Sequence, residues 1–369
     1  MAYSAISKPQ LHFDVLNYTG NGATSSAGTT ARTLTGLGFQ PSWVWNKEEN
    51  DTEQHFLQDA VRGVTKVLTS SSTGSQADCL TDYSSGGINT FTSDGFTLGS
   101  GTGGNANNIN TNGNGYRNYC WKGAGSSTTN NDGTVATSVQ VNASAGFSIV
   151  DCDLSSASGS VTLGHGLGVT PEFIIAKSKY TAGSAGSWFC FHKVLPTNEY
   201  LALNTNTGQA NDSGVWGSSP VNNNTFQISN VSNWGGNRVI AYCFASKKGY
   251  QKIGNYKGNG NASGTFVYTG FKPAYVLVKR YDSTPGNWCQ MDIKNDGFNP
   301  TNKQIHPNTN GVETLGSGTT IDILSNGFKC RVTDDDKNGG SNKKYIYHAI
   351  AAEPLVANVT GNGMPATAN

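Results

Sequence analysis

The sequence has few charged residues and no long apolar run. Asp, Glu, Lys and Arg make up 13% of the 369 residues, about half of the usual share, and the formal net charge is only +1. No basic run is present, so the chain lacks the electrostatic footprint of a nucleic-acid-binding protein. No stretch of about eighteen apolar residues is present either, which predicts no transmembrane helix and no membrane insertion.

Several chemical signatures are also missing. The N-terminus has no basic segment followed by an apolar one, so no signal peptide is expected and the protein should be made in a cytoplasm. The seven cysteines have no C-x-x-C spacing, which argues against zinc and favours small buried hydrophobic residues, while a disulfide between repeats stays open. The six histidines lie outside any G-x-S-x-G context, and no P-loop or dinucleotide motif occurs. The sequence therefore predicts no enzyme activity and no cofactor.

Glycine and repetition are what the sequence does contain. The 47 glycines are close to twice the average share. Together with abundant Asn, Ser and Thr they disfavour helices and suit short strands joined by turns. Asn-Gly and Asp-Gly pairs, such as those that begin at Asn21 and Asp94, are typical of hairpin turns. Gln54 to Val61 is the one segment expected to form a helical turn.

One pattern occurs three times. A glycine-containing turn, a proline, an aromatic or aliphatic run and a lysine six residues after the proline are found at Thr35–Lys47, His165–Lys177 and Tyr268–Lys279. The prolines, Pro41, Pro171 and Pro273, lie 130 and 102 residues apart, and the same intervals separate Phe96, Phe226 and Phe328. A tyrosine-centred run closes each repeat, and His348 is expected to replace the cysteine that follows the tyrosine in the first two.

This repeat predicts an all-β fold of three tandem related β-sandwich, jelly-roll-like units. The units are expected at 11–123, 140–249 and 250–355. A Gly/Ser/Asn-rich linker at 124–139, an N-terminal docking segment at 1–10 and a C-terminal tail at 356–369 complete the chain. Because both terminal segments are poor in apolar residues, we expect them to become ordered only on a partner.

The runs after the second and third prolines have a distinct pattern. Phe173–Ala176 and Tyr275–Val278 are apolar on both faces, which indicates strands buried between two layers. A lysine ends each of the three equivalent strands, at Lys47, Lys177 and Lys279. A solvated strand end is the favoured interpretation of these lysines, and a ligand contact repeated three times is the alternative.

Several of these segments resemble a known family. They are Asn17–Gly22, Thr35–Lys47, Asp59–Gly63, Asp94–Gly99 and Tyr119–Lys122. Together they resemble a repeated module of virion proteins from tailed bacteriophages of marine bacteria, described as tail-fibre-like or virion structural proteins. The first unit carries most of the match, and the other two lack the Asp-Ala-Val-Arg-Gly segment. The resemblance implies a virion protein, assembled in the host cytoplasm, with other tail or capsid proteins as partners and an adhesive or architectural role.

Two groups of residues are candidates for a site. Asp334, Asp335 and Asp336 form an acidic cluster in a loop. A solvated turn is favoured there, a calcium site is the alternative because carboxylate and backbone oxygens suit that ion, and a catalytic carboxylate pair is disfavoured because adjacent strand residues point apart. Trp216 and Trp234 lie in Gly/Ser/Asn-rich segments, where packing of the loop is the favoured interpretation and stacking on a glycan is the alternative.

These observations favour a tail fibre or tail-associated adhesin that attaches the particle to its host, with a host surface glycan as a further partner. A capsid decoration or head-fibre protein is the alternative, and a carbohydrate-binding or depolymerase tail protein is a second. A secreted bacterial adhesin is disfavoured by the missing signal peptide. No coiled-coil heptads specify an oligomer, so a pseudo-threefold monomer and a homotrimer are both open.

Overall fold

The computed structural model describes residues 4, 6–180, 186–217, 221–235, 238–295, 297–316, 318, 320–340 and 342–354. The described elements are strands apart from one short α-helix, α1 (Asn107–Asn110), and 3-10 turns such as Pro9–Leu11 and Val231–Trp234. The all-β prediction is confirmed. The helical turn expected at Gln54–Val61 is wrong, because Phe56–Asp59 is a strand whose pairing along a neighbouring strand overrides local preference.

Strand pairing within residues 13–121 gives a first group of two sheets. The main sheet has the order β1-β9-β3-β4-β5-β6, and a smaller sheet has the order β2-β8-β7. The strands are β1 (Phe13–Thr19), β2 (Thr30–Thr35), β3 (Trp43–Glu48), β4 (Phe56–Asp59), β5 (Lys66–Leu68), β6 (Ala77–Asp78), β7 (Gly87–Thr92), β8 (Gly95–Gly99) and β9 (Gly115–Trp121).

Residues 128–244 form a second group. Its main sheet has the order β10-β11-β12-β19-β14-β15-β16-β17, and β13 pairs with β18. The strands are β10 (Thr128–Asn130), β11 (Thr137–Asn142), β12 (Phe147–Asp153), β13 (Val161–Gly164), β14 (Phe173–Ser178), β15 (Trp188–His192), β16 (Glu199–Ala202), β17 (Ala210–Asn211), β18 (Thr225–Ile228) and β19 (Arg238–Phe244). The segment 124–139, expected to be a linker, thus supplies β10 and the start of β11, consistent with the β-propensity of its threonines.

Residues 251–354 form a third group. Its main sheet has the order β20-β28-β22-β23, a smaller one has the order β21-β27-β26, and β24 pairs with β25. The strands are β20 (Gln251–Lys257), β21 (Phe266–Tyr268), β22 (Phe271–Arg280), β23 (Trp288–Asp292), β24 (Lys303–Gln304), β25 (Thr314–Leu315), β26 (Ile321–Leu324), β27 (Gly327–Cys330) and β28 (Lys344–Pro354).

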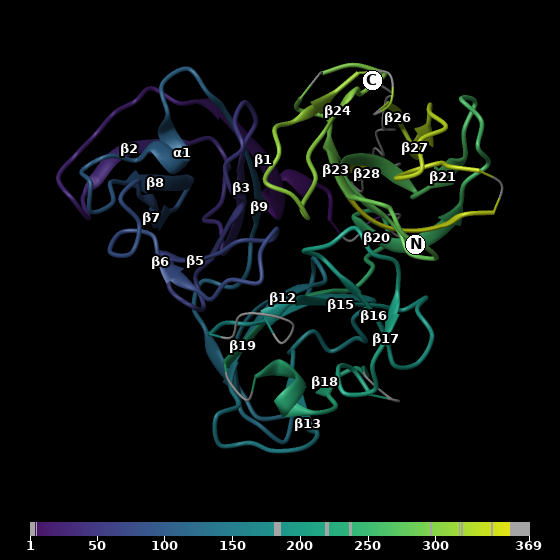
Figure 1. Cartoon of the computed structure of the whole chain (residues 1–369), viewed down its shortest axis with the longest axis horizontal. Coiled ribbons are helices and arrows are strands. Elements are labelled where there is room, and N and C mark those ends of the chain that lie inside the picture. The colour runs from purple at the N-terminus through teal and green to yellow at the C-terminus, as the bar shows by residue number, and fades with distance from the viewer. Residues whose placement is uncertain are drawn as a thin grey trace.

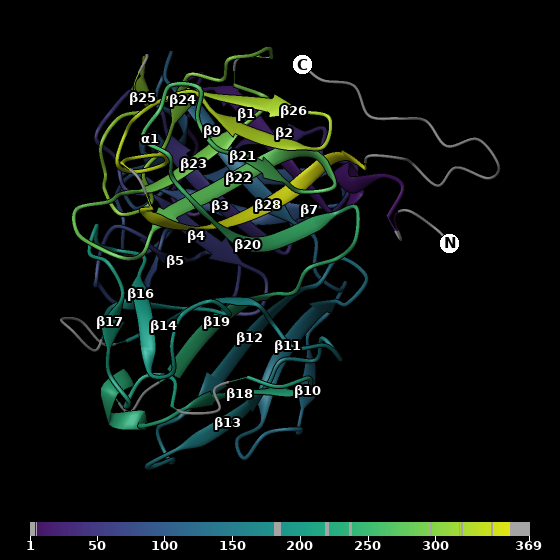
Figure 2. The same ribbon diagram turned by 90° about the vertical axis from the view of Figure 1, so that its right-hand side faces the viewer.

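The central strands of the main sheets, β3, β14 and β22, are buried on both faces. On β14, Ile174 and Ala176 pack with the smaller sheet of their own group, whereas Phe173 and Ile175 join a cluster shared by all three groups. We call this shared set the central cluster. Its members include Phe13, Trp43, Trp121, Phe147, Tyr242, Phe244, Tyr275, Trp288 and Ile350. Figure 1 shows the three groups as lobes around this centre, and Figure 2 shows the second group beneath the other two.

The strand after each landmark proline occupies the same place in its sheet. β3, β14 and β22 each lie between a hairpin partner and the closing strand of the group. The residue pairs across the closing strand are Trp45 with Tyr119, Ile175 with Tyr242, and Leu277 with His348. His348 therefore stands at the tyrosine position, and the expectation that it replaces the cysteine is wrong by one residue.

A repeated hydrogen bond links neighbouring groups. The indole Nε1 of Trp188 donates to the Thr69 carbonyl at 2.8 Å, from the second group to the first. Trp288 Nε1 donates to the Ala202 carbonyl at 2.9 Å, from the third to the second. His55 lies just before β4, at a place similar to those of the two tryptophans, which are the first residues of β15 and β23. Its Nε2 lies 3.1 Å from the His306 carbonyl of the third group. The three bonds close a ring.

A second ring uses backbone groups alone. The amide of Gln76 donates to the Lys179 carbonyl at 2.6 Å, and the amide of Gln209 donates to the Tyr281 carbonyl at 2.7 Å. The Glu313 amide completes this ring on the Glu49 carbonyl at 2.9 Å. Each acceptor lies two residues after the landmark lysine of its group. Within each ring all three bonds point the same way around the centre, as the interfaces of a cyclic trimer do, and the two rings point in opposite directions.

The N-terminal segment packs on the chain itself where it is described. Ile6 is buried in the central cluster, and Gln10 Nε2 donates to the Ala352 carbonyl at 2.5 Å. From Ile6 onward the segment is therefore held by contacts within this protein, whereas we expected it to become ordered only on a partner. Residues 1–3 and 5 of that segment, and the tail at 356–369, lie outside the described residues.

Two further predictions concern single residue types and membrane contact. All seven cysteines are buried free thiols, as the prediction of small buried hydrophobic residues required. No helix in the described ranges has the length and apolarity of a membrane span.

Candidate functional site

Trp216 and Trp234 lie inside the second group. Their exposed fractions are 1% and 0%, and the two rings meet edge to face with centroids 5.3 Å apart. Trp234 ends the 3-10 turn Val231–Trp234, which the Asn230 side chain caps by accepting from the Ser232 amide. This turn folds a polar segment back over β15. Neither ring is available to stack on a glycan, so the favoured interpretation of packing holds and the alternative of a glycan contact is wrong for both residues.

The Asp334–Asp336 loop is held by donors from the chain. Asp335 accepts from Lys343 Nζ at 2.5 Å and from Arg280 Nη1 at 3.2 Å. Asp336 accepts from the backbone amide of Asn287 at 2.6 Å and from its side-chain amide at 3.1 Å. Asp334 lies 3.3 Å from the buried Lys337 ammonium. Calcium needs free oxygen ligands, and these carboxylates are matched by cations and amides instead, which makes the loop a structural anchor.

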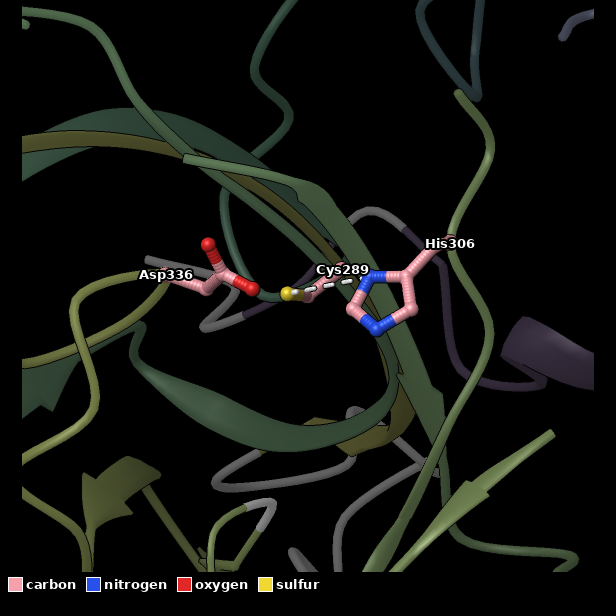
Figure 3. A group of neighbouring side chains, drawn as sticks. All are labelled: Cys289, His306 and Asp336. Carbon is pink, nitrogen blue, oxygen red and sulfur yellow. Dashed lines mark hydrogen bonds between the residues drawn. The ribbon is translucent and has the colours of Figure 1, made fainter. Parts of the chain in front are cut away.

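One of these carboxylates belongs to a group with metal-ligand chemistry. Ligand atoms of Cys289, His306 and Asp336 lie within 4.8 Å of one another, and Figure 3 shows the thiol between the carboxylate and the imidazole. His306 Nδ1 lies 2.9 Å from the Trp288 carbonyl, so Nδ1 carries a proton. Burial raises the pKa of the Cys289 thiol, whereas a metal requires the thiolate. The geometry fits an internal hydrogen-bonded cluster and supplies no argument for a bound metal.

The three landmark lysines are buried, and the favoured solvated strand end is wrong for all of them. Lys47, Lys177 and Lys279 have exposed fractions of 1%, 0% and 0%. Each Nζ donates to a carbonyl in the loop that follows its own strand: Lys47 to Asp51 at 3.0 Å, Lys177 to Gly186, and Lys279 to Gly286 at 2.7 Å. The repeated lysine therefore closes a loop, and the alternative of a repeated ligand contact has no exposed atom to act through.

Burial also changes the acidity of these ammonium groups. Loss of hydration lowers the pKa of Lys47 to about 8 and that of Lys279 to about 8. The same effect lowers the pKa of Lys177 to about 7. Backbone carbonyls compensate part of the lost hydration. The repeated lysine therefore affects the stability of the fold and not the binding of a ligand.

A lysine-lined cleft lies where the second and third groups meet. It has a volume of about 480 Å³ and lies between the start of β14 and the end of β15 on one side and β20 and β21 on the other. We call it the lysine cleft. Its lining residues are Glu172, Lys193, Ser246, Lys247, Lys248, Gly249, Gln251, Lys252, Ile253, Tyr268, Thr269 and Gly270. A second cavity of about 370 Å³ adjoins it and shares Glu172 and Lys193.

The comparison with protein families gives one match. A family model described as a domain of unknown function (DUF7483) matches residues 8–354. The chain belongs to this family. No curated protein and no solved structure is significantly similar to it.

The DUF7483 match extends over all three sheet groups as one unit. It begins at Lys8, just before the first described turn, and ends at Pro354, the last residue of β28. The family is thus defined over the whole ring and not over a single repeat. This agrees with the central cluster, to which every group contributes.

The lysine cleft of this DUF7483 chain is the feature that sequence reasoning missed. Lys247, Lys248 and Lys252 lie close together in the sequence, whereas Lys193 lies far from them. The fold brings them together because β15 of the second group ends beside β20 of the third. No motif places these four lysines at a fixed spacing, so the sequence does not predict the cleft.

Proposed function

We propose that this chain is a non-enzymatic structural and adhesive protein of a tailed-bacteriophage particle, most directly a tail fibre or tail-associated adhesin. The observation that carries the proposal is the closed ring of three sheet groups around one central cluster. The motif resemblance of the first group to virion structural modules supports the proposed location.

The ring favours an architectural role because it reproduces cyclic symmetry within one chain. Phage tails and capsids present threefold and quasi-threefold positions, and a molecule with three equivalent junctions can occupy such a position as a single copy. A monomer with pseudo-threefold symmetry is therefore the oligomeric state we propose. Part of the N-terminal segment packs on the centre through Ile6, which leaves the outer faces of the groups for contact with other virion proteins.

The candidate site chemistry favours binding over catalysis. The carboxylates of Asp334, Asp335 and Asp336 are engaged by donors of the chain, and the Cys289 thiol is fully buried. A depolymerase would need two carboxylates placed about a glycosidic bond with room for the sugar. Incubation with host polysaccharide should release no reducing ends.

A capsid decoration or head-fibre protein is the second candidate. The same ring favours it, since a pseudo-threefold monomer also fits a quasi-threefold capsid position. The two candidates differ in where the protein is found, so a localisation experiment separates them.

Immunogold electron microscopy of intact particles with an antibody to this chain is the deciding test. Label at the tail supports the adhesin, and label over the head replaces it with the decoration protein. Mass spectrometry of purified particles provides the control, and absence of the chain from them would reject both candidates.

A further inference from the structure

The lysine cleft has an excess of positive charge. Four lysines line it, Lys193, Lys247, Lys248 and Lys252, and Glu172 is the acidic residue among them. Glu172 is already engaged, because it pairs with Lys193 at 3.0 Å and accepts from the Ser246 hydroxyl. Within the described part of the chain, Lys247 and Lys252 have no carboxylate partner. Two ammonium groups therefore remain for an anion from outside.

An aromatic ring forms one wall of the cleft. Tyr268 is 52% exposed, and the Lys252 ammonium lies 5.1 Å from its ring centroid. Lys252 Nζ also donates to the Tyr268 carbonyl at 2.8 Å, which fixes the two side by side. Gly270 stands next to the ring, and a Cβ there would lie 3.5 Å from the Tyr268 hydroxyl. A sugar ring stacks on an exposed aromatic face of this kind.

The ammonium groups of Lys193 and Lys252 repel one another across the cleft. Burial lowers the pKa of Lys252, and the neighbouring Lys193 lowers it further. A bound anion would relieve this repulsion and form charge-assisted hydrogen bonds. The cleft thus combines ammonium donors with a partly apolar wall, which is the composition of a small-ligand site.

The other two junctions lack this chemistry. The pairing register of the strands identifies the positions in the other groups that are equivalent to Lys193 and Lys252. Lys193 corresponds to the residues after Asp59 and Asp292, and the equivalents of Lys252 follow from its pairing with the closing strand of its group. The equivalent positions are Ala60 and Ile293 for Lys193, and Asp14 and Ser148 for Lys252. At the junction of the third and first groups, Asp14 is paired with Lys294 at 2.7 Å. The positive cleft is therefore a local departure from the repeat and not a requirement of its packing.

We propose that the lysine cleft binds an acidic sugar, with the anionic group on Lys247 and Lys252 and the sugar ring against Tyr268. Its role in host attachment rests on the proposed function, whereas the binding itself does not. A carboxylate and a phosphate ester present the same chemistry to the lysines, so uronic-acid and sugar-phosphate sources are separated by experiment.

The test is isothermal titration calorimetry on the purified full chain with three probes: digalacturonate, glucose 6-phosphate and neutral cellobiose. We expect one or both acidic probes to bind at least about tenfold more tightly than cellobiose, because each charge-assisted bond contributes that much or more. The stronger acidic probe identifies the source. Equal affinities for acidic and neutral probes, or no binding of any probe, would overturn the proposal.

Variants assign the binding to the cleft. Lys247→Ala with Lys252→Ala should weaken the acidic probe by about tenfold or more, and Tyr268→Ala should weaken it by about tenfold through lost stacking. Lys257→Ala is the matched control, an exposed lysine on the same strand, β20, outside the cleft. Unchanged affinity in a double variant with native unfolding behaviour would reject the assignment. Binding by a protein that immunogold does not find on particles would reject only the proposed function.

Discussion

Trp43 and Tyr242 belong to different sheets, yet their rings stack with centroids 4.0 Å apart and 11° between the planes. Trp43 also stacks on Trp121 at 4.1 Å within its own sheet. The pair thus joins the first and second groups through the central cluster.

Trp43→Ala should lower the free energy of unfolding by about 3–5 kcal/mol, as removal of a large buried aromatic does. Because the central cluster is shared, we expect all three groups to unfold together in one transition. Urea denaturation followed by circular dichroism and by intrinsic fluorescence measures both. Leu315→Ala, at a 61% exposed position, is the control and should change little. Two separated transitions would contradict a shared core.

Trp288→Phe tests the ring of side-chain hydrogen bonds. The change removes the indole donor to the Ala202 carbonyl, which keeps the Thr205 amide as a donor at 3.4 Å. We therefore expect a loss of about 0.5–1.5 kcal/mol for the missing hydrogen bond, beyond the effect of the smaller ring. Trp121→Phe is the matched control, since its Nε1 is buried without a hydrogen-bond partner. Urea denaturation measures the free energy of unfolding of both variants. Equal decreases in the two would show that the Trp288 hydrogen bond does not contribute to stability.

Lys177→Met tests the buried ammonium. Burial lowers the pKa of Lys177 to about 7, so above that pH the unfolded chain binds more protons than the folded one and stability rises with pH. This group alone contributes a slope of about 1.4 kcal/mol per pH unit above about pH 7. The variant should lose that part of the slope between about pH 7 and 9. Lys193→Met, at a side chain 43% exposed, should keep it.

His192→Phe tests the acid side. Burial lowers the pKa of His55, His192 and His348 to about 3 each. The unfolded chain therefore binds more protons between about pH 3 and 6.5, and stability is lost as pH falls through this window. Removing one histidine should reduce the acid slope by about 1.4 kcal/mol per pH unit. Urea denaturation at a series of pH values measures it, and an unchanged slope would show that His192 takes up a proton in the folded state.

The repeated landmarks predicted much of the fold from the sequence. The shared intervals between the prolines and the phenylalanines correspond to equivalent strands in the three groups, and the two-sided apolar runs at Phe173 and Tyr275 are buried on both faces. What local sequence could not show is which layer covers the second face. For Phe173 that layer comes from the neighbouring groups, and contacts between segments so far apart leave no periodic signal.

The site residues were less predictable because loop geometry, and not residue type, decides whether they are buried. Trp234 lies among Gly and Asn, a composition typical of exposed loops, but the turn capped by Asn230 returns it to the core. Lys177 is charged, yet Gly186 provides a carbonyl that lets it be buried. In each case a hydrogen bond between residues that lie near each other in the sequence helps to bury a side chain that the composition would place in solvent.

The ring of three groups has a consequence for how this protein evolves. In a homotrimer one codon change alters every interface at once, so a damaging substitution is felt three times. Here each junction is encoded separately, and a substitution at Lys193 or Lys252 leaves the positions of Ala60 and Asp14 untouched. Because the three groups are linked in one chain, a substitution affects one junction at a time. One junction can therefore change its specificity while the other two preserve the assembly.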